Sequence, residues 1–316
     1  MALKIVITDA DTVFDGNITT DFLLPFGEVA AYPLTAPEEL AERIRDADIV
    51  LCNKTRIGRE DMASANRLKY IGLFATGYNN IDISAAHDCG ITVCNVPGYS
   101  TDAVAQHTFA FILALLNRVG EYNETVKLGD WIKSRTFSYF PFPTGELAGK
   151  TIGIVGYGSI GRKVGRIARA FGMHILVFNR RTVNDENVMQ VDFDTLLRQS
   201  DIVTMHCPLN PDSEKMMNSG AFARMKNGAL FINTARGALC DEYALRDALE
   251  SGRLGGAGVD VLCEEPMNER CPLLGLKNCL ITPHIAWAGL ETRRRLMKAV
   301  AENIKAFLGG KPQNEV

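Results

Sequence analysis

Along this 316-residue chain, segments whose hydrophobic residues have the pattern of strands alternate with segments in which they have the period of helices. Short apolar runs rich in β-branched residues have the length of strands, and between them apolar residues recur at helical spacing. In the first part of the chain we expect strands at residues 3–8, 29–32, 47–52, 68–74 and 91–96. Strands that alternate with helices predict parallel sheets covered on both faces, so we expect an α/β fold.

The same alternation continues in the second half of the chain. A long apolar helix at residues 101–116 is expected to connect two domains. Further helices are expected at residues 193–199, 242–251 and 291–308, and strands at 151–155, 174–178, 202–206, 229–233, 256–261 and 279–282. The length of the chain agrees with two domains of about 150 residues each.

A glycine-rich turn joins the strand at residues 151–155 to the helix that follows it. Gly156, Gly158 and Gly161 have the spacing G-x-G-x-x-G. The first glycine permits a tight turn, the second lets the backbone approach a pyrophosphate, and the third lets the helix pack close to the strand. The amino end of the helix offers N–H groups to phosphates. A glycine turn without a ligand is the alternative, but the strand–turn–helix context favours a dinucleotide.

The next strand of this segment ends at Asn179, which precedes Arg180 and Arg181. Sites that prefer NAD usually have Asp or Glu here, because a carboxylate binds the ribose hydroxyls. A neutral residue followed by two guanidinium groups instead suits the 2′-phosphate of NADP. Two solvated loop arginines are the alternative. We expect NADP(H) to be favoured, with NAD(H) possible.

Three later strands are followed by side chains that can take part in a reaction. Arg236, Glu265 and His284 come from the segments NTARG, DVLCEEP and TPHIAW. Strands of one parallel sheet have their carboxyl ends at one edge, so all three can converge on a nicotinamide. Arginine can hold a carboxylate, histidine can donate a proton to a developing alkoxide, and glutamate can hydrogen-bond the other ring nitrogen. Each alone could be structural, but together they predict hydride transfer to a 2-keto acid.

The composition argues against several other classes of protein. A net charge of −3 offers no electrostatic case for nucleic acid or an anionic membrane, and no helix has the about 20 apolar residues that span a bilayer. The eight cysteines include no C-x-x-C pair. We therefore expect reduced thiols, no metal site and a cytoplasmic location.

The segment from Gly129 to Gly145 combines many aromatic residues with little periodicity. Aromatic side chains that cannot join their own core predict an arm that packs on another subunit. A local aromatic cluster is the alternative. Its aromatic residues are Trp131, Phe137, Tyr139, Phe140 and Phe142.

Taken together, GYGSIG, NTARG, DVLCEEP and TPHIAW resemble the motifs of the D-isomer-specific 2-hydroxyacid dehydrogenases, over nearly the whole chain. The resemblance implies two doubly wound parallel-sheet domains. A Rossmann cofactor domain, residues 101–287, would be inserted into a flavodoxin-like substrate domain of residues 1–100 and 288–316. It also implies a homodimer and the reduction of a small 2-keto acid, such as hydroxypyruvate or glyoxylate, to the D-2-hydroxy acid. Arg236 would then bind the substrate, His284 would be the acid/base and Glu265 would tune the histidine.

The resemblance also assigns ligand contacts. Cofactor contacts would come from the 179–181 turn and from Ser159, Ile160, Cys207, Pro208, Ser213, Thr234, Ala235 and Asp260, with Asp260 at the carboxamide. Asn53, Thr76 and Gly77 would bind the substrate, and Thr76 and Gly77 also follow a strand at its carboxyl end. Two alternatives stay open: a 3-phosphoglycerate dehydrogenase, for which Lys54 and Arg56 could supply positive charge, and a non-catalytic dinucleotide-sensing protein of the same fold.

Overall fold

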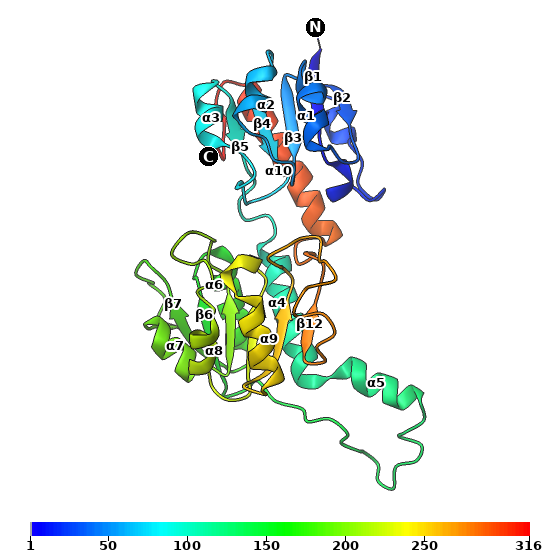
Figure 1. Ribbon diagram of the computed structural model, residues 1–316, viewed down its shortest axis with the longest axis vertical. Helices are drawn as coiled ribbons and strands as arrows, with labels where there is room; N and C mark the ends of the chain where they lie inside the picture. The colour runs from blue at the N-terminus through cyan, green and yellow to red at the C-terminus, as the bar shows by residue number, and fades with distance from the viewer. Residues whose placement is uncertain (1) are drawn as a thin grey trace. The chain divides into compact units, whose positions relative to one another are not determined.

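The computed structural model describes residues 2–316, which divide into two compact units (Figure 1). The first unit contains residues 2–100 together with Ala288–Val316, and the second contains Thr101–Trp287. Each unit is an all-parallel sheet with helices packed on it. The α/β class and the two parallel-sheet domains predicted from the sequence are confirmed.

The first unit has a five-stranded sheet in the order β2-β1-β3-β4-β5, which is the flavodoxin-like order. Its central strands β3 and β4 are buried along their whole length, as continuous apolar runs in parallel sheets usually are. The strands are β1 Leu3–Ile7, β2 Gly27–Ala31, β3 Ile49–Cys52, β4 Tyr70–Leu73 and β5 Thr92–Cys94. The α-helices are α1 Pro37–Ile44, α2 Arg59–Ser64, α3 Ile83–Asp88 and α10 Leu290–Leu308.

The carboxyl-terminal helix α10 completes the first unit, although 195 residues separate it from β5. The ring of Phe307 on α10 lies 4.8 Å from the ring of Tyr70 on β4. Asn303, which is buried, donates a hydrogen bond to the carbonyl of Asn95 at 2.9 Å. The chain therefore leaves this unit after β5 and returns to it at its end, as an inserted domain requires.

The second unit has a seven-stranded sheet in the order β12-β11-β10-β9-β6-β7-β8. The chain runs from β6 outward to β8 and then starts again at β9, on the other side of β6. This change of direction between β6 and β9 is where open parallel sheets bind ligands, at the carboxyl ends of the strands. The strands are β6 Thr151–Val155, β7 His174–Phe178, β8 Met189–Gln190, β9 Ile202–Met205, β10 Ala229–Asn233, β11 Leu254–Val259 and β12 Cys279–Ile281.

Helices on both faces bury this sheet. On one face Phe111 of α4 packs so closely on β11 that a Cβ at Gly258 would lie 2.5 Å from its ring. On the other face the rings of Phe222 on α8 and Phe231 on β10 are 5.3 Å apart. The helices are α4 Thr101–Asn117, α5 Val119–Lys127, α6 Ser159–Ala170, α7 Phe193–Gln199, α8 Ser219–Arg224 and α9 Glu242–Glu250.

Besides short 3-10 helices, the sequence pattern did not predict α5, α8 and β8, which the structure forms within residues 2–316. Helix α5 buries none of its residues, so it has no apolar face for a periodicity to reveal. Strand β8 has two residues, both exposed, and α8 has six residues. Among the helices of residues 2–316, none combines the length and the apolar character that a membrane crossing requires.

Candidate active site

The glycine turn after β6 leaves room for a phosphate group. Gly156 has φ +93° and a Cβ there would lie 2.6 Å from the backbone nitrogen of Cys207, while a Cβ at Gly161 would collide with the carbonyl oxygen of Gly156. At Gly158, by contrast, an added Cβ would meet no atom within 4 Å. No side chain caps the amino end of α6, so its first N–H groups are available to an anion. This geometry fits the pyrophosphate of a dinucleotide.

The turn after β7 carries two exposed arginines, Arg180 and Arg181. The Asn179 side chain holds this turn to the glycine loop, because its Oδ1 accepts the Tyr157 N–H at 3.1 Å and its Nδ2 donates to the Arg181 carbonyl at 2.9 Å. Burial raises the pKa of the Cys207 thiol to about 11, and the charge of Arg180 acts in the opposite direction. The turn is thus joined to the glycine loop at the carboxyl end of β6.

Arg236 lies in the turn after β10. The buried side chain of Asn233 braces this turn, since its Nδ2 donates to the Arg236 carbonyl at 2.8 Å and its Oδ1 accepts the Ala235 N–H at 3.1 Å. A Cβ at Gly237 would collide with the backbone of Leu262. Only glycine lets the Arg236 turn approach the loop after β11 this closely.

The loops after β11 and β12 bring a carboxylate and an imidazole together. The Nδ1 atom of His284 lies 2.8 Å from Oε2 of Glu265, and the other carboxylate oxygen accepts the Leu262 N–H at 3.0 Å. An ionised carboxylate only accepts hydrogen bonds, so Nδ1 of His284 carries a proton. The glutamate therefore orients the imidazole through Nδ1, and Nε2 is the ring nitrogen that this contact does not use.

Asp260 holds the segment that carries His284. It is 1% exposed, and its carboxylate accepts the N–H groups of Ile285 at 2.8 Å and Ala286 at 2.9 Å and the Thr282 hydroxyl at 2.5 Å. The His284 N–H donates to the Asp260 carbonyl at 2.8 Å, and His284 itself has φ +54°. Asp260 thus keeps His284 in a backbone conformation that few residues other than glycine adopt.

Sequence reasoning did not identify one histidine in this arrangement. His107 on α4 lies with Nε2 2.9 Å from the Thr282 hydroxyl and 3.7 Å from Asp260 Oδ1. It stands in an apolar helix about 150 residues before Asp260, so no local pattern connects the two. The available signal was a polar stretch, Gln106 to Thr108, that interrupts the apolar pattern of α4.

The remaining predicted cofactor residues lie at the same edge of the sheet. The Ser213 hydroxyl is buried and donates to the Pro208 carbonyl at 2.8 Å. The Thr234 hydroxyl lies 3.1 Å from that of Thr108 on α4. Ser159 and Ile160 form the first turn of α6. The Ser213 and Thr234 hydroxyl groups bond within the protein, so at these two positions a cofactor would be offered backbone groups.

The predicted substrate residues belong to the first unit and follow β3 and β4. Asp9, 2% exposed, accepts the N–H groups of Asn53 at 2.9 Å, Lys54 at 2.5 Å and Thr55 at 2.8 Å. The amide of Asn53 donates to the Thr12 hydroxyl at 3.1 Å. Asp9 therefore fixes the backbone of this loop, and the Asn53 side chain is used in a hydrogen bond within the first unit.

The Thr76–Gly77 turn is held in a similar way. The Thr76 hydroxyl donates to the Val96 carbonyl at 2.7 Å, and the Asn95 amide donates to the Thr76 carbonyl at 2.7 Å. Thr76 is nevertheless an exposed residue. Both loops of the first unit are thus ordered by hydrogen bonds that do not depend on a ligand.

Comparison with known proteins identifies the family of the chain. The model of the D-isomer-specific 2-hydroxyacid dehydrogenase NAD-binding domain matches residues 109–286, more than half of the chain. The chain belongs to this family. It is therefore a dehydrogenase, and the family recognised from its motifs is confirmed.

Individual relatives agree with the family match. The dehydrogenase is 41% identical to a hydroxypyruvate reductase of Blautia hydrogenotrophica, over 99% of both chains. It is 39% identical to a glycerate dehydrogenase of Methylorubrum extorquens, over 100% of this chain and 99% of the relative. Among solved structures, an acyclic imino acid reductase in complex with NADPH and D-Arg has a TM-score of 0.88 at 34% identity, covering 99% of this chain and all of the other.

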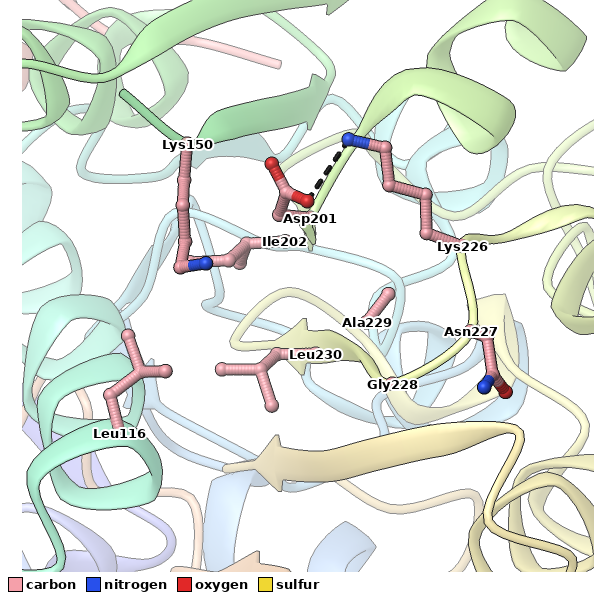
Figure 2. A pocket seen from close by; sticks show the side chains of 9 residues that line it. All are labelled: Leu116, Lys150, Asp201, Ile202, Lys226, Asn227, Gly228, Ala229 and Leu230. Carbon is pink, nitrogen blue, oxygen red and sulfur yellow. Dashed lines mark hydrogen bonds and ion pairs between the residues drawn. The ribbon is translucent and has the colours of Figure 1, made fainter. Parts of the chain in front are cut away.

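The dehydrogenase also has a cavity of about 180 Å³ at the amino ends of the strands in its second unit (Figure 2). Lys150, Asp201 and Lys226 lie at its rim, and Lys226 pairs with Asp201 at 2.9 Å. This edge of the sheet is opposite to the glycine turn and to His284. The cavity is therefore separate from the candidate active site.

His206 makes the stability of the dehydrogenase depend on pH. Its Nε2 lies 2.9 Å from the Thr204 hydroxyl, and its Nδ1 is buried without a hydrogen-bond partner in residues 2–316. Burial lowers the pKa of His206 from 6.5 to about 3. Between these two values the unfolded chain binds a proton that the folded chain does not, so stability falls as the pH falls.

We therefore expect His206→Asn to flatten the acid side of the stability profile. Between pH 6.5 and pH 5 the free energy of unfolding of the wild type should fall by about 1.5 kcal/mol more than that of the variant. Urea unfolding at both pH values, followed on the transition of the second unit, measures the difference. Equal pH dependence in the two proteins would show that His206 is protonated as readily in the folded state as in the unfolded chain.

Proposed function

We propose that the enzyme reduces a small 2-keto acid, such as hydroxypyruvate or glyoxylate, to the D-2-hydroxy acid and prefers NADPH as the reductant. The observation that carries the proposal is the 2.8 Å contact between Glu265 and His284, formed beside the Arg236 turn at the edge that bears the glycine loop. An oriented acid, a cation and a dinucleotide turn are the groups that this reaction needs.

In the proposed reaction, Arg236 binds the substrate carboxylate and polarises the adjacent carbonyl. When bound, the reduced nicotinamide supplies a hydride to the carbonyl carbon. His284 gives the proton on its Nε2 to the carbonyl oxygen, so the carbonyl becomes a hydroxyl group. Glu265 remains ionised and stabilises the imidazolium before transfer. His284 then regains a proton from solvent, which closes the cycle.

The preference for NADPH rests on the turn after β7. Arg180 and Arg181 are exposed there, and no carboxylate stands at position 179 to bind the ribose hydroxyls. The side chain of Asn179 is already used in two hydrogen bonds within the protein. A related reductase, solved in complex with NADPH, supports the proposed preference.

The substrate class follows from the relatives together with the site. Hydroxypyruvate reductase and glycerate dehydrogenase are the names of two relatives that match the chain over nearly its whole length. We assign the substrate carboxylate to Arg236. We place the enzyme in the cytoplasm, because its eight cysteines are free thiols.

The test is a panel of 2-keto acids with both reduced cofactors, followed at the nicotinamide absorbance. We expect the highest kcat/KM with hydroxypyruvate or glyoxylate and NADPH. Turnover confined to a phosphorylated keto acid would favour a 3-phosphoglycerate dehydrogenase, for which Lys54 and Arg56 are available. Binding of a dinucleotide without turnover of any 2-keto acid would favour a sensing protein and reject the proposal.

We also propose that the enzyme is a homodimer formed through the aromatic segment of residues 129–145. Its apolar side chains Ile132, Phe137 and Phe140 are exposed by 87%, 91% and 84%, and Leu128 directly before the segment is exposed by 74%. One aromatic residue of the segment does pack locally, since the ring of Phe142 lies 5.4 Å from that of Tyr122 on α5. The local cluster thus leaves exposed apolar groups that a second copy of the chain would bury.

We expect the double variant Phe137→Ser, Phe140→Ser to weaken the dimer. Loss of two buried aromatic side chains should raise the dissociation constant about 100-fold or more. Sedimentation velocity over a range of concentrations measures this change. Leu34→Ser, at a residue of the first unit that is 62% exposed, is the matched control and should leave the dimer intact. A monomeric wild type, or a double variant as dimeric as the control, would reject the proposed interface.

A further inference from the structure

We infer that Gln190 is a positioning residue for cofactor choice, because its side chain holds the turn that carries Arg180 and Arg181. The inference rests on the proposed use of NADPH, which it deepens. Gln190 lies on strand β8, at the edge of the sheet in the second unit.

The Gln190 amide bonds to the turn at three points. Its Nε2 donates to the Asn179 carbonyl at 2.9 Å and to the Arg181 carbonyl at 3.1 Å. Its Oε1 accepts the Val183 N–H at 2.9 Å. One side chain therefore forms hydrogen bonds with the main chain before Arg180, at Arg181 and at Val183.

The turn is held from its other side by Asn179. That side chain joins the Tyr157 N–H of the glycine loop to the Arg181 carbonyl. The Arg181 carbonyl thus accepts hydrogen bonds from both Asn179 and Gln190. Together the two amides connect the glycine loop, the arginine turn and β8. These hydrogen bonds fix the main chain from which the two arginine side chains extend.

This arrangement matters because both arginines are exposed and long. A flexible turn would have to become ordered when the cofactor binds, and the lost entropy would weaken binding. A turn that is ordered in advance avoids this cost. The benefit is specific, because only NADP carries the 2′-phosphate that two guanidinium groups can bind, whereas NAD has a hydroxyl there.

The main chain of β8 does not depend on the Gln190 side chain. Val177 on β7 is the register partner of Gln190, and the Val191 N–H donates to the Val177 carbonyl at 2.9 Å. The Tyr157 hydroxyl also donates to Asp185 at 2.9 Å, which ties the middle of the 179–190 segment to the glycine loop. A substitution at Gln190 should therefore loosen the arginine turn without unfolding the sheet.

The test compares dissociation constants for NADPH and NADH in wild type and Gln190→Met, measured by calorimetry on the cofactor-free protein. Methionine keeps the length of the side chain and removes its three hydrogen bonds. We expect the dissociation constant for NADPH to rise about tenfold, while that for NADH changes less than twofold. Gln190→Glu should raise the NADPH constant further, because it replaces the two donors with a carboxylate near the phosphate.

Two further variants give the scale of the effect. Met189→Leu changes the neighbouring residue of β8, which is 62% exposed, and should leave both constants unchanged. Arg180→Ala removes one guanidinium group and gives the effect of losing a proposed phosphate contact directly. Thermal unfolding of each variant shows whether the second unit remains as stable as in the wild type.

The outcomes separate this inference from the proposal on which it rests. A wild type that binds NADH as tightly as NADPH would overturn the proposed cofactor preference, and this inference with it. A wild type that prefers NADPH, with a preference that Gln190→Met does not change, would overturn this inference alone. An equal loss of affinity for both cofactors would also overturn it, because Gln190 would then have only a general structural role.

Discussion

His284→Gln is expected to lower kcat for the reduction of a 2-keto acid by about 10²- to 10⁴-fold, the usual range for a lost general acid. Glutamine keeps a polar side chain of similar reach but cannot donate a proton from an imidazolium. The dissociation constant for NADPH should stay within about twofold of the wild type, because the phosphate groups bind elsewhere at the glycine turn. Stopped-flow measurement of NADPH oxidation and calorimetry of NADPH binding check the two parts.

Glu265→Gln provides the matched control for this prediction. A glutamine there can still accept a hydrogen bond from Nδ1 of His284, but it lacks the charge that stabilises the imidazolium. We expect a smaller loss of kcat than for His284→Gln, because the imidazole keeps its hydrogen bond and loses only a stabilising charge. If His284→Gln retained near-normal kcat, the proton would have to come from another group.

Arg236→Ala is expected to lower kcat/KM for the keto acid by about 10²- to 10⁴-fold, with NADPH binding preserved. The physical reason is that one guanidinium would both bind the carboxylate and stabilise charge on the developing alkoxide. The Arg236 turn is braced by Asn233 and by the close contact of Gly237, so the substitution should not disturb the fold. Steady-state kinetics with hydroxypyruvate and with glyoxylate measures the loss.

Two controls distinguish this role from a structural one. Arg236→Lys keeps the charge but not the planar fork, so it should recover only part of the lost activity. Added guanidinium ion should partly rescue Arg236→Ala at concentrations that leave the wild type unchanged. If Arg236→Ala had wild-type kcat/KM, another cation would have to bind the substrate carboxylate. Lys54 would then be the next residue to substitute.

Local sequence patterns contained enough information for the elements that carry the site. Strand β6, the glycine turn and α6 were predictable because strand period, glycine spacing and helix period follow one another within about 20 residues. The parallel sheets were predictable because strands alternate with helices. Arg236, Glu265 and His284 were recognisable as candidates because each follows a strand of one sheet, and such positions share an edge.

Other elements leave little trace in the sequence. Helix α5 has no buried face, and β8 has two exposed residues, so neither has a periodicity. The aromatic segment showed that its side chains needed partners. The pattern could not separate Phe142, which packs on Tyr122 of α5, from Phe137 and Phe140, which stay exposed. That division depends on where the chain folds back on α5.

The chemistry of single residues was determined by the sequence, because charge, proton affinity and the small size of glycine belong to the residue type. The sequence by itself therefore specified an α/β dehydrogenase with a dinucleotide turn and three reactive side chains. Only the tertiary structure showed that Asp260 supports the His284 segment with His107 nearby, and that Asn179 and Gln190 together hold the arginine turn. Such contacts join residues that are up to 175 positions apart, and their hydrogen bonds depend on atomic positions that only the packed sheet and its helices create.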